Sequence, residues 1–222
     1  ATSAVDNSDP SEPSDGALPV VCFDADGTLW DGESGQLFAR WLVDKQVLPG
    51  DVMERYEELL AEDVSQAYAW LTSCMAGLRE REVIEYATYF VDRVWRTHLY
   101  PEMAALIAGL ERQQVEIWIL SASNRWLVEE AARNLGMDRA RCIGMAVKVV
   151  QGVLTDSFDG PLVNREGKVE AIDTFIGRRP IFAGGNSVND LPMLHAATAG
   201  AMLVNPSSEA AASLGTSLRA YG

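Results

Sequence analysis

The chain has 222 residues, of which 48% are hydrophobic and 23% are charged, and its formal net charge at pH 7 is -14. This composition is that of a folded globular protein, and the negative charge argues against nucleic acid and anionic membrane surfaces as partners. No apolar run approaches the ~18 residues that a membrane-spanning helix needs. The length suits one large domain, or a core domain with a smaller insert.

The amino-terminal segment, residues 1–18, is rich in Ser, Asp, Pro and Glu and has no hydrophobic periodicity. We therefore expect a disordered polar tail. The chain begins at Ala1, as it would after removal of either an initiator Met or a leader. The sequence is therefore compatible both with a cytoplasmic protein and with one exported after removal of a leader.

An apolar run at residues 20–23 leads directly into Asp24-Ala25-Asp26-Gly27-Thr28. Alternation along an extended strand would place the carboxylates of Asp24 and Asp26 on one face. Two close carboxylates repel each other unless a cation or a shared proton compensates them. The pattern favours a divalent metal site with one Asp as nucleophile and the other as proton donor. The alternative is a strand that ends in an ordinary acidic turn.

The segment 33–98 has almost no strand signal. Helical patterns cover residues 33–46, 51–61, 64–78 and 80–96. This stretch is too long for a simple crossover between strands. We predict a helical cap at 33–98, inserted into a catalytic core formed by 19–32 and 99–222.

The rest of the chain alternates between strands and helices. Besides 20–23, strands are predicted at 115–120, 180–183 and 201–204, and helices at 103–113, 125–135, 168–176 and 190–197. Asn124 is the expected N-cap of the helix that follows it. Residues 143–154 have the pattern of a β-hairpin that turns at Gln151-Gly152. The alternation predicts an α/β fold with a doubly wound parallel sheet.

The cysteines and histidines lack the spacing of a metal site. Cys22 lies within an apolar strand and is expected in the core, whereas a disulfide between Cys74 and Cys142 stays open. His98 and His195 are too isolated for a zinc site.

Three later segments also place polar groups at strand ends or helix starts. Ser121 follows an apolar strand, where it could hold a phosphoryl oxygen or simply cap a helix. Lys168 lies near a helix start, where the macrodipole disfavours a cation, so a phosphate-neutralising role gains weight. Residues 184–190 form a polar, metal-competent loop after a strand, at the edge where such sheets bind ligands.

These four segments, in this order over residues 19–205, resemble the motifs of the haloacid dehalogenase superfamily of hydrolases. The resemblance implies Asp24 as the nucleophile, Asp26 as the general acid and base, and Lys168 as the lysine that neutralises phosphate. It also implies a set of residues that bind substrate or phosphate, namely Thr28, Glu33, Ser121, Ala122, Lys168 and Asn189. The implied cofactor is Mg²⁺, at a site to which Asp24, Asp26 (through its main-chain carbonyl), Asn186 and Asp190 belong.

Within this superfamily the second Asp of the first motif marks phosphatases and phosphomutases rather than dehalogenases. The helical insert is similar to the cap of the phosphoserine-phosphatase-like branch, and Glu33 matches the substrate-contacting Glu of that branch. The cap Arg expected near Leu71, which would hold a substrate carboxylate, has no counterpart here. The motifs also resemble phosphorylcholine-phosphatase relatives, in which Trp30, Trp70 and Glu33 could hold a quaternary ammonium. The alternative for both tryptophans is core packing, which we favour.

At position 186 this chain has an Asn where the resemblance leads us to expect an acid. An amide oxygen can still bind Mg²⁺ but adds no charge. We predict a Mg²⁺-dependent phosphomonoesterase that acts on a small phosphate ester, such as phosphorylcholine, phosphorylethanolamine or phosphoserine. The alternatives are a phosphotransferase or mutase, and a catalytically weak phosphate-ester-binding protein. The sequence leaves the oligomeric state open.

Overall fold

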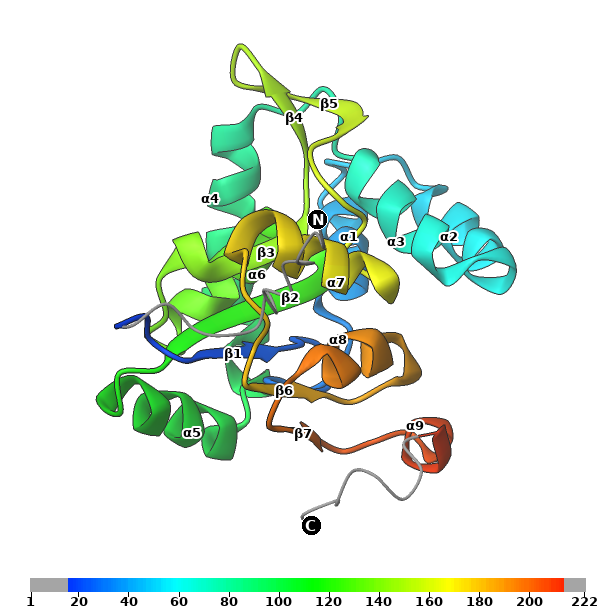
Figure 1. Cartoon of the computed structure of the whole chain (residues 1–222). Coiled ribbons are helices and arrows are strands. Elements are labelled where there is room, and N and C mark those ends of the chain that lie inside the picture. The colour runs from blue at the N-terminus through cyan, green and yellow to red at the C-terminus, as the bar shows by residue number, and fades with distance from the viewer. Residues whose placement is uncertain (1–15, 214–222) are drawn as a thin grey trace, which may run out of the picture.

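A five-stranded parallel sheet forms the centre of the computed structural model, which describes residues 16–213 (Figure 1). Its strand order is β3-β2-β1-β6-β7. The strands are β1 (Val20–Phe23), β2 (Glu116–Asn124), β3 (Cys142–Met145), β6 (Phe182–Gly185) and β7 (Gly200–Leu203). The α/β class predicted from the sequence is therefore confirmed. Residues 1–15, most of the expected tail, lie outside the described residues.

Alternate residues of the strands are buried on opposite faces of the sheet. Val21 and Phe23 belong to one hydrophobic cluster, and Val20 and Cys22 belong to the other. Burial on both faces explains why β1 is an uninterrupted apolar run. The first face is covered by α5 (Pro101–Arg112) and α6 (Arg125–Arg133), and the second by α7 (Glu166–Ala171) and α8 (Leu191–Ala196). A short helix, α9 (Ser208–Ser213), follows β7.

Four further helices lie between β1 and α5 in the chain. They are α1 (Ser34–Asp44), α2 (Val52–Glu62), α3 (Val64–Ser73) and α4 (Glu80–Phe90). The last predicted helix, 80–96, is not uniform, because α4 passes into a π-helical turn at Val91–Trp95 and a 3-10 turn at Arg96–His98. Among residues 16–213, none of the helices is both long enough and apolar enough to cross a bilayer.

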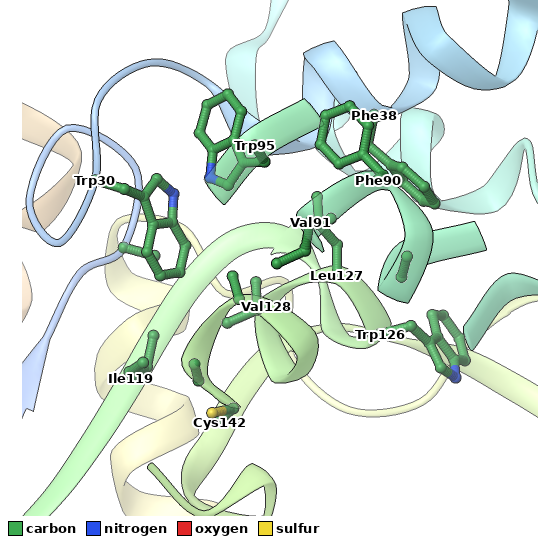
Figure 2. Packing of buried hydrophobic residues seen from close by; sticks show 14 of the residues in the cluster. Trp30, Phe38, Phe90, Val91, Trp95, Ile119, Trp126, Leu127, Val128 and Cys142 are labelled. Carbon is green, nitrogen blue, oxygen red and sulfur yellow. The ribbon is translucent and has the colours of Figure 1, made fainter. Parts of the chain in front are cut away.

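The inserted helices share their hydrophobic core with the sheet. Phe90 and Val91, at the end of α4, lie beside Leu127 and Val128 of α6 in Figure 2, and all four are at most 1% exposed. The same cluster contains Ile119 of β2. The inserted helices are therefore packed on the core at α6, in addition to being connected to the core by the chain at both ends.

The predicted hairpin at 143–154 is wrong in its first half. Residues Cys142–Met145 pair with β2 as the fifth strand of the main sheet, with Ile143 opposite Leu120. The hairpin itself consists of β4 (Val147–Val150) and β5 (Val153–Phe158). Gln151 and Gly152 have φ values of 51° and 77°, and two left-handed residues in this position are typical of a tight hairpin turn. A buried apolar run cannot by itself reveal which of two neighbouring sheets it joins.

Main-chain hydrogen bonds join this hairpin to the loop between α3 and α4. The amide of Gly77 donates to the carbonyl of Leu154 at 2.8 Å, and the amide of Leu154 donates to the carbonyl of Leu78 at 2.9 Å. The amide of Glu80 donates to the carbonyl of Gly152 at 2.9 Å. We call this set of contacts the hairpin strap.

Strand β2 is longer than predicted. It continues past Leu120 to Asn124, with a register shift against β3 between these two residues. Ser121 and Ser123 therefore belong to the irregular end of a strand. Asn124 caps α6 as predicted, because its side chain accepts a hydrogen bond from the amide of Leu127 at 3.0 Å.

All three cysteines are free thiols, so the disulfide that the sequence left open between Cys74 and Cys142 is not formed. Burial raises the pKa of Cys22 and of Cys142 to about 12, and that of Cys74 to about 11. A raised pKa keeps a thiol protonated and unreactive at neutral pH.

We expect the folded protein to react slowly with iodoacetamide at pH 8, because a pKa of about 11 leaves only ~10⁻³ of Cys74 as thiolate. Reaction should accelerate as the pH rises toward 11. Mass spectrometry at timed intervals measures the labelling, and protein unfolded in guanidinium chloride, which should label at all three thiols, is the control. Rapid labelling of Cys74 in folded protein at pH 8 would contradict the raised pKa that partial burial gives this thiol.

Candidate active site

A cavity of about 80 Å³ lies where β1, β2 and β6 end. Every sequence-predicted site residue except Thr28 lines it. The lining residues are Asp24, Asp26, Glu33, Tyr68, Ser121, Ala122, Ser123, Asn164, Lys168, Asn186, Ser187, Asn189 and Asp190. The fold thus brings the four motif segments to one place, as expected for the carboxyl edge of a parallel sheet, and adds Tyr68 from the inserted helix α3.

Lys168 joins two carboxylates at the base of this cavity. Its Nζ lies 2.5 Å from Oδ1 of Asp24 and 2.6 Å from Oδ1 of Asp190. Lys168 and Asp190 are each 1% exposed, and Asp24 is 7% exposed. Burial alone would lower the pKa of Lys168, but the negative charges of Asp190 and Asp24 outweigh it and raise that pKa. Lys168 is therefore held as an ammonium ion.

Asp24 follows β1 directly. Its amide donates to the carbonyl of Gly184 at 2.8 Å, which continues the pairing with β6. Oδ1 faces Lys168, and Oδ2 accepts a hydrogen bond from Oγ1 of the fully buried Thr28 at 3.1 Å. Burial and the charge of Asp190 raise the pKa of Asp24 to about 7, against the opposing effect of Lys168. Thr28 contacts the predicted nucleophile and does not line the cavity.

Asp190 accepts four hydrogen bonds, one of them from Lys168. Its Oδ2 accepts from the amides of Asn186 and Ser187, at 3.0 and 2.9 Å, and from the Ser187 hydroxyl at 3.1 Å. Burial works to raise the pKa of Asp190, but Lys168 and these amides outweigh it and leave the pKa below its ordinary value. Asp190 therefore fixes both the position of Lys168 and the shape of the loop after β6.

Asn186 lies against the turn that follows Asp26. Gly27 has φ of +73°, and a Cβ added there would lie 2.0 Å from Nδ2 of Asn186. A side chain at position 27 would therefore displace Asn186. The two amide atoms of Asn186 are interchangeable by rotation, so either can face the cavity.

The cavity has an excess of negative charge. Of the described residues that line it, four are acidic, namely Asp24, Asp26, Glu33 and Asp190, and Lys168 is the basic one. No group of three His, Cys, Asp or Glu side chains within residues 16–213 is arranged as a metal site. Asp24, the Asn186 amide and the main-chain carbonyl of Asp26 nevertheless offer only oxygen donors, which suit a hard divalent cation.

Asp26 is held by three donors. Oδ1 accepts from Nε1 of Trp30 at 2.5 Å and from the amide of Ser34 at 2.9 Å. Oδ2 accepts from the hydroxyl of Ser123 at 2.6 Å. Trp30 is fully buried and does not line the cavity, nor does Trp70, which packs against the core. The core-packing alternative therefore holds for both tryptophans.

Ser121 and Ala122 lie beside Asp26 at the end of β2. Oγ of Ser121 accepts a hydrogen bond from the amide of Ser123 at 3.1 Å. The hydroxyl hydrogen of Ser121 is then available to a ligand in the cavity. This geometry suits the predicted role of Ser121 in holding a phosphoryl oxygen.

Two residues of the insert, Glu33 and Tyr68, contribute to the lining of the cavity. The hydroxyl of Tyr68, in α3, donates to Oε2 of Glu33 at 3.4 Å. Neighbouring protein atoms partly desolvate the Glu33 carboxylate, and this desolvation, together with the charge of Asp26, raises its pKa. Glu33 is nevertheless an exposed residue, so water weakens this effect. Nδ2 of Asn164, in the core, donates to Oγ of Ser65 at the start of α3, at 2.8 Å. This bond joins the core to the insert at Asn164, which lines the cavity.

The sequence did not single out Ser123, Tyr68 or Asn164. Ser123 follows Ser121 by two residues, so strand alternation could have placed both hydroxyls on one side. Tyr68 and Asn164 carry no local signal, because they reach the cavity only through the packing of α3 on the sheet. Asn189, which the sequence did predict, accepts a hydrogen bond from Nε of Arg165 at 2.9 Å.

Comparisons with known proteins agree with this geometry. The family of haloacid dehalogenase-like hydrolases matches residues 21–195. The chain is 30% identical over 188 residues to the phosphoserine phosphatase SerB2 of Mycobacterium tuberculosis, a match that covers 82% of this chain and 43% of that protein. The chain thus spans less than half the length of that relative.

Two solved structures share the fold. A protein of unknown function from Bordetella pertussis Tohama I superposes with a TM-score of 0.78 at 23% identity, over 93% of this chain and 99% of that one. A phosphoserine phosphohydrolase-like protein from Francisella tularensis gives a TM-score of 0.65 at 16% identity, over 91% and 95% of the two chains. With its four motifs gathered around one cavity, the chain belongs to the haloacid dehalogenase-like hydrolase family, in the branch that resembles phosphoserine phosphatase.

Proposed function

We propose that this protein is a phosphomonoesterase that works through an aspartyl-phosphate intermediate. The observation that carries the proposal is the pairing of a buried Asp24, held by Lys168, with Asp26 in the same cavity. A carboxylate nucleophile and a separate carboxyl proton donor are the two groups that such a reaction requires.

The reaction has two steps. A carboxylate oxygen of Asp24 attacks phosphorus, the bond to the alcohol oxygen breaks, and that oxygen takes the proton of Asp26. Water then attacks the phosphorus of the aspartyl phosphate and gives its proton to Asp26, which releases phosphate and restores Asp24. Lys168 and the Ser121 hydroxyl stabilise the charge on the transferring phosphoryl group.

The proposal includes Mg²⁺, which would neutralise part of the phosphate charge when bound. Asp24, Asn186 and the main-chain carbonyl of Asp26 would hold it. Four carboxylates against one lysine would otherwise repel a phosphate dianion. Asp190, the fourth residue expected at the metal site, would act through Lys168 and the loop, because its Oδ2 already accepts three hydrogen bonds and its Oδ1 faces Lys168.

The insert would serve as the cap, with 33–98 covering a core of 19–32 and 99–222. Glu33 and Tyr68 bring insert side chains to the cavity mouth. A cap in this position would exclude water from the reaction and select the alcohol.

The substrate would be a small ester with a cationic alcohol portion. A cavity of about 80 Å³ has room for a phosphate group and little more. Glu33 lies at its mouth, and apart from Lys168 no lining residue is a Lys or Arg that could hold a carboxylate. Phosphorylethanolamine and phosphorylcholine fit these charges better than phosphoserine, the ester after which the relative SerB2 is named.

Replacement of the nucleophile is the first test. Asp24→Asn should lower turnover by ~10³-fold or more, since it removes the covalent pathway. Phosphate release from a panel of small esters with Mg²⁺ measures this. Asp44→Asn, which removes one exposed charge from α1, is the matched control and should keep its activity. Activity of Asp24→Asn near that of the unmodified protein would contradict the covalent mechanism.

The second test concerns Asn186. Asn186→Asp should tighten Mg²⁺ binding by about tenfold, or ~1.4 kcal/mol, because a carboxylate adds a charge to the ligand set. Isothermal titration calorimetry measures the affinity independently of turnover. Asn189→Asp adds the same charge to the same cavity and controls for the general electrostatic attraction of Mg²⁺ to a more negative cavity. Equal changes in the two variants, or none, would exclude Asn186 as a ligand.

The third test concerns the alcohol. The kcat/KM for phosphorylethanolamine should exceed that for phosphoserine, and Glu33→Gln should reduce this preference by raising KM for the cationic ester. The neutral aryl ester p-nitrophenyl phosphate is the control and should change less. A preference of the unmodified protein for phosphoserine, or an equal effect of Glu33→Gln on all esters, would reject the cationic pocket.

A further inference from the structure

The two carboxylate oxygens of Asp26 have different surroundings. Oδ1 accepts two N–H donors, Nε1 of Trp30 and the amide of Ser34. Both N–H groups can only donate and cannot act as acceptors, so both lone-pair positions of Oδ1 are occupied. A proton on Oδ1 would have to displace one of them, and Trp30 and Ser34 are both fully buried.

Oδ2 has a free position. Within residues 16–213, its hydrogen-bond partner is the hydroxyl of Ser123, at 2.6 Å. A serine hydroxyl has one hydrogen, and the oxygen of Ser123 already accepts the amide of Gly35 at 3.1 Å. The hydrogen is therefore directed at Oδ2, and the second lone pair of Oδ2 remains for a proton.

We propose that Ser123 and Trp30 are positioning residues that make Oδ2 of Asp26 the atom that exchanges the proton with the substrate. This inference rests on the phosphomonoesterase function proposed above. In the first step, the bond between phosphorus and the alcohol oxygen breaks with its electron pair on that oxygen. The oxygen then receives the proton from Oδ2, and Asp26 becomes a carboxylate. Ser123 holds Oδ2 toward the cavity, and Trp30 prevents the carboxyl group from rotating.

The same contacts join the acid to the insert. Ser34 and Gly35 are the first residues of α1, and their amides bind Asp26 and Ser123, respectively. A Cβ on Gly35 would lie 2.6 Å from the Ser123 oxygen, so α1 can approach this closely only with glycine there. Asp26 is therefore oriented fully only when α1 is docked on the end of β2.

Leaving groups that differ in their need for a proton provide the test. An alkyl ester such as glycerol 2-phosphate needs acid assistance to release its alcohol, whereas p-nitrophenolate leaves without it. The kcat/KM of Ser123→Ala should therefore fall at least ~10-fold more for glycerol 2-phosphate than for p-nitrophenyl phosphate, a part of the 10²–10⁴ that a positioned acid contributes. Trp30→Phe, which removes the N–H and keeps an aromatic ring, should discriminate in the same direction.

Ser65→Ala is the control. It removes the hydrogen bond that Asn164 donates to Ser65 of α3 and leaves the contacts of α1 with Asp26 and Ser123 in place. It should lower kcat/KM for the two esters by the same factor. Thermal unfolding of each variant establishes that it is folded. If Ser123→Ala does not fold, the comparison of the two esters is made with Trp30→Phe.

Equal falls for the two esters in Ser123→Ala and Trp30→Phe would overturn the proposal, as would discrimination by Ser65→Ala equal to that of Ser123→Ala. Either result leaves the phosphatase function standing, because the unmodified protein would still hydrolyse both esters. Failure of the unmodified protein to release phosphate from either ester would instead overturn the proposed function, and this inference with it.

Discussion

The buried ammonium of Lys168 is the contact on which the rest of the site depends. It lies between Asp24, at the end of β1, and Asp190, at the start of α8, and so joins three segments that are far apart in the chain. Removal of one partner from a buried charge group typically costs about 3–5 kcal/mol, because the remaining charges lose their compensation. Without Lys168, two carboxylates would face each other with little water to separate them.

The backbone around Lys168 is built to bring it there. Gly167 packs against the preceding loop so closely that a Cβ would lie 1.7 Å from the carbonyl oxygen of Leu162. Because Gly167 has no side chain, the first turn of α7 can press against that loop. Lys168 then points inward from the first turn of a helix, against the preference of the helix dipole. The unfavourable location in the sequence is therefore explained by the two acids that it contacts.

The sequence predicted the parts of this site that depend on local structure. Asp24, Ser121 and the loop after β6 follow apolar strands, and parallel strands of one sheet end at a common edge. Lys168 was found from its unusual place in a helix. The contacts of Asp26 could not be predicted, because Trp30 and Ser34 meet it through a turn and Ser123 arrives from a neighbouring strand.

The same limit explains the errors in the fold. Residues 142–145 are a short apolar run, and nothing in their composition tells an edge strand of the main sheet from the arm of a hairpin. The tight turn at Gln151-Gly152 was found correctly because it requires left-handed backbone at two adjacent residues. Signals that restrict the local backbone are therefore more informative here than hydrophobicity alone.

The hairpin strap has a consequence for how a substrate reaches the cavity. Three main-chain hydrogen bonds hold residues 77–80 to β5 and its turn, and the end of α4 is buried against α6. On the other side of the insert, α3 packs on the sheet through Ala67 and Leu71, and one side-chain hydrogen bond, donated by Asn164 to Ser65, joins it to the core loop. The two edges thus differ in their hydrogen bonds, with three main-chain bonds at the strap and one side-chain bond at Asn164. An opening that keeps the strap would turn about residues 77–80 and first part α3 from Asn164, so the alcohol portion would enter and leave beside Tyr68.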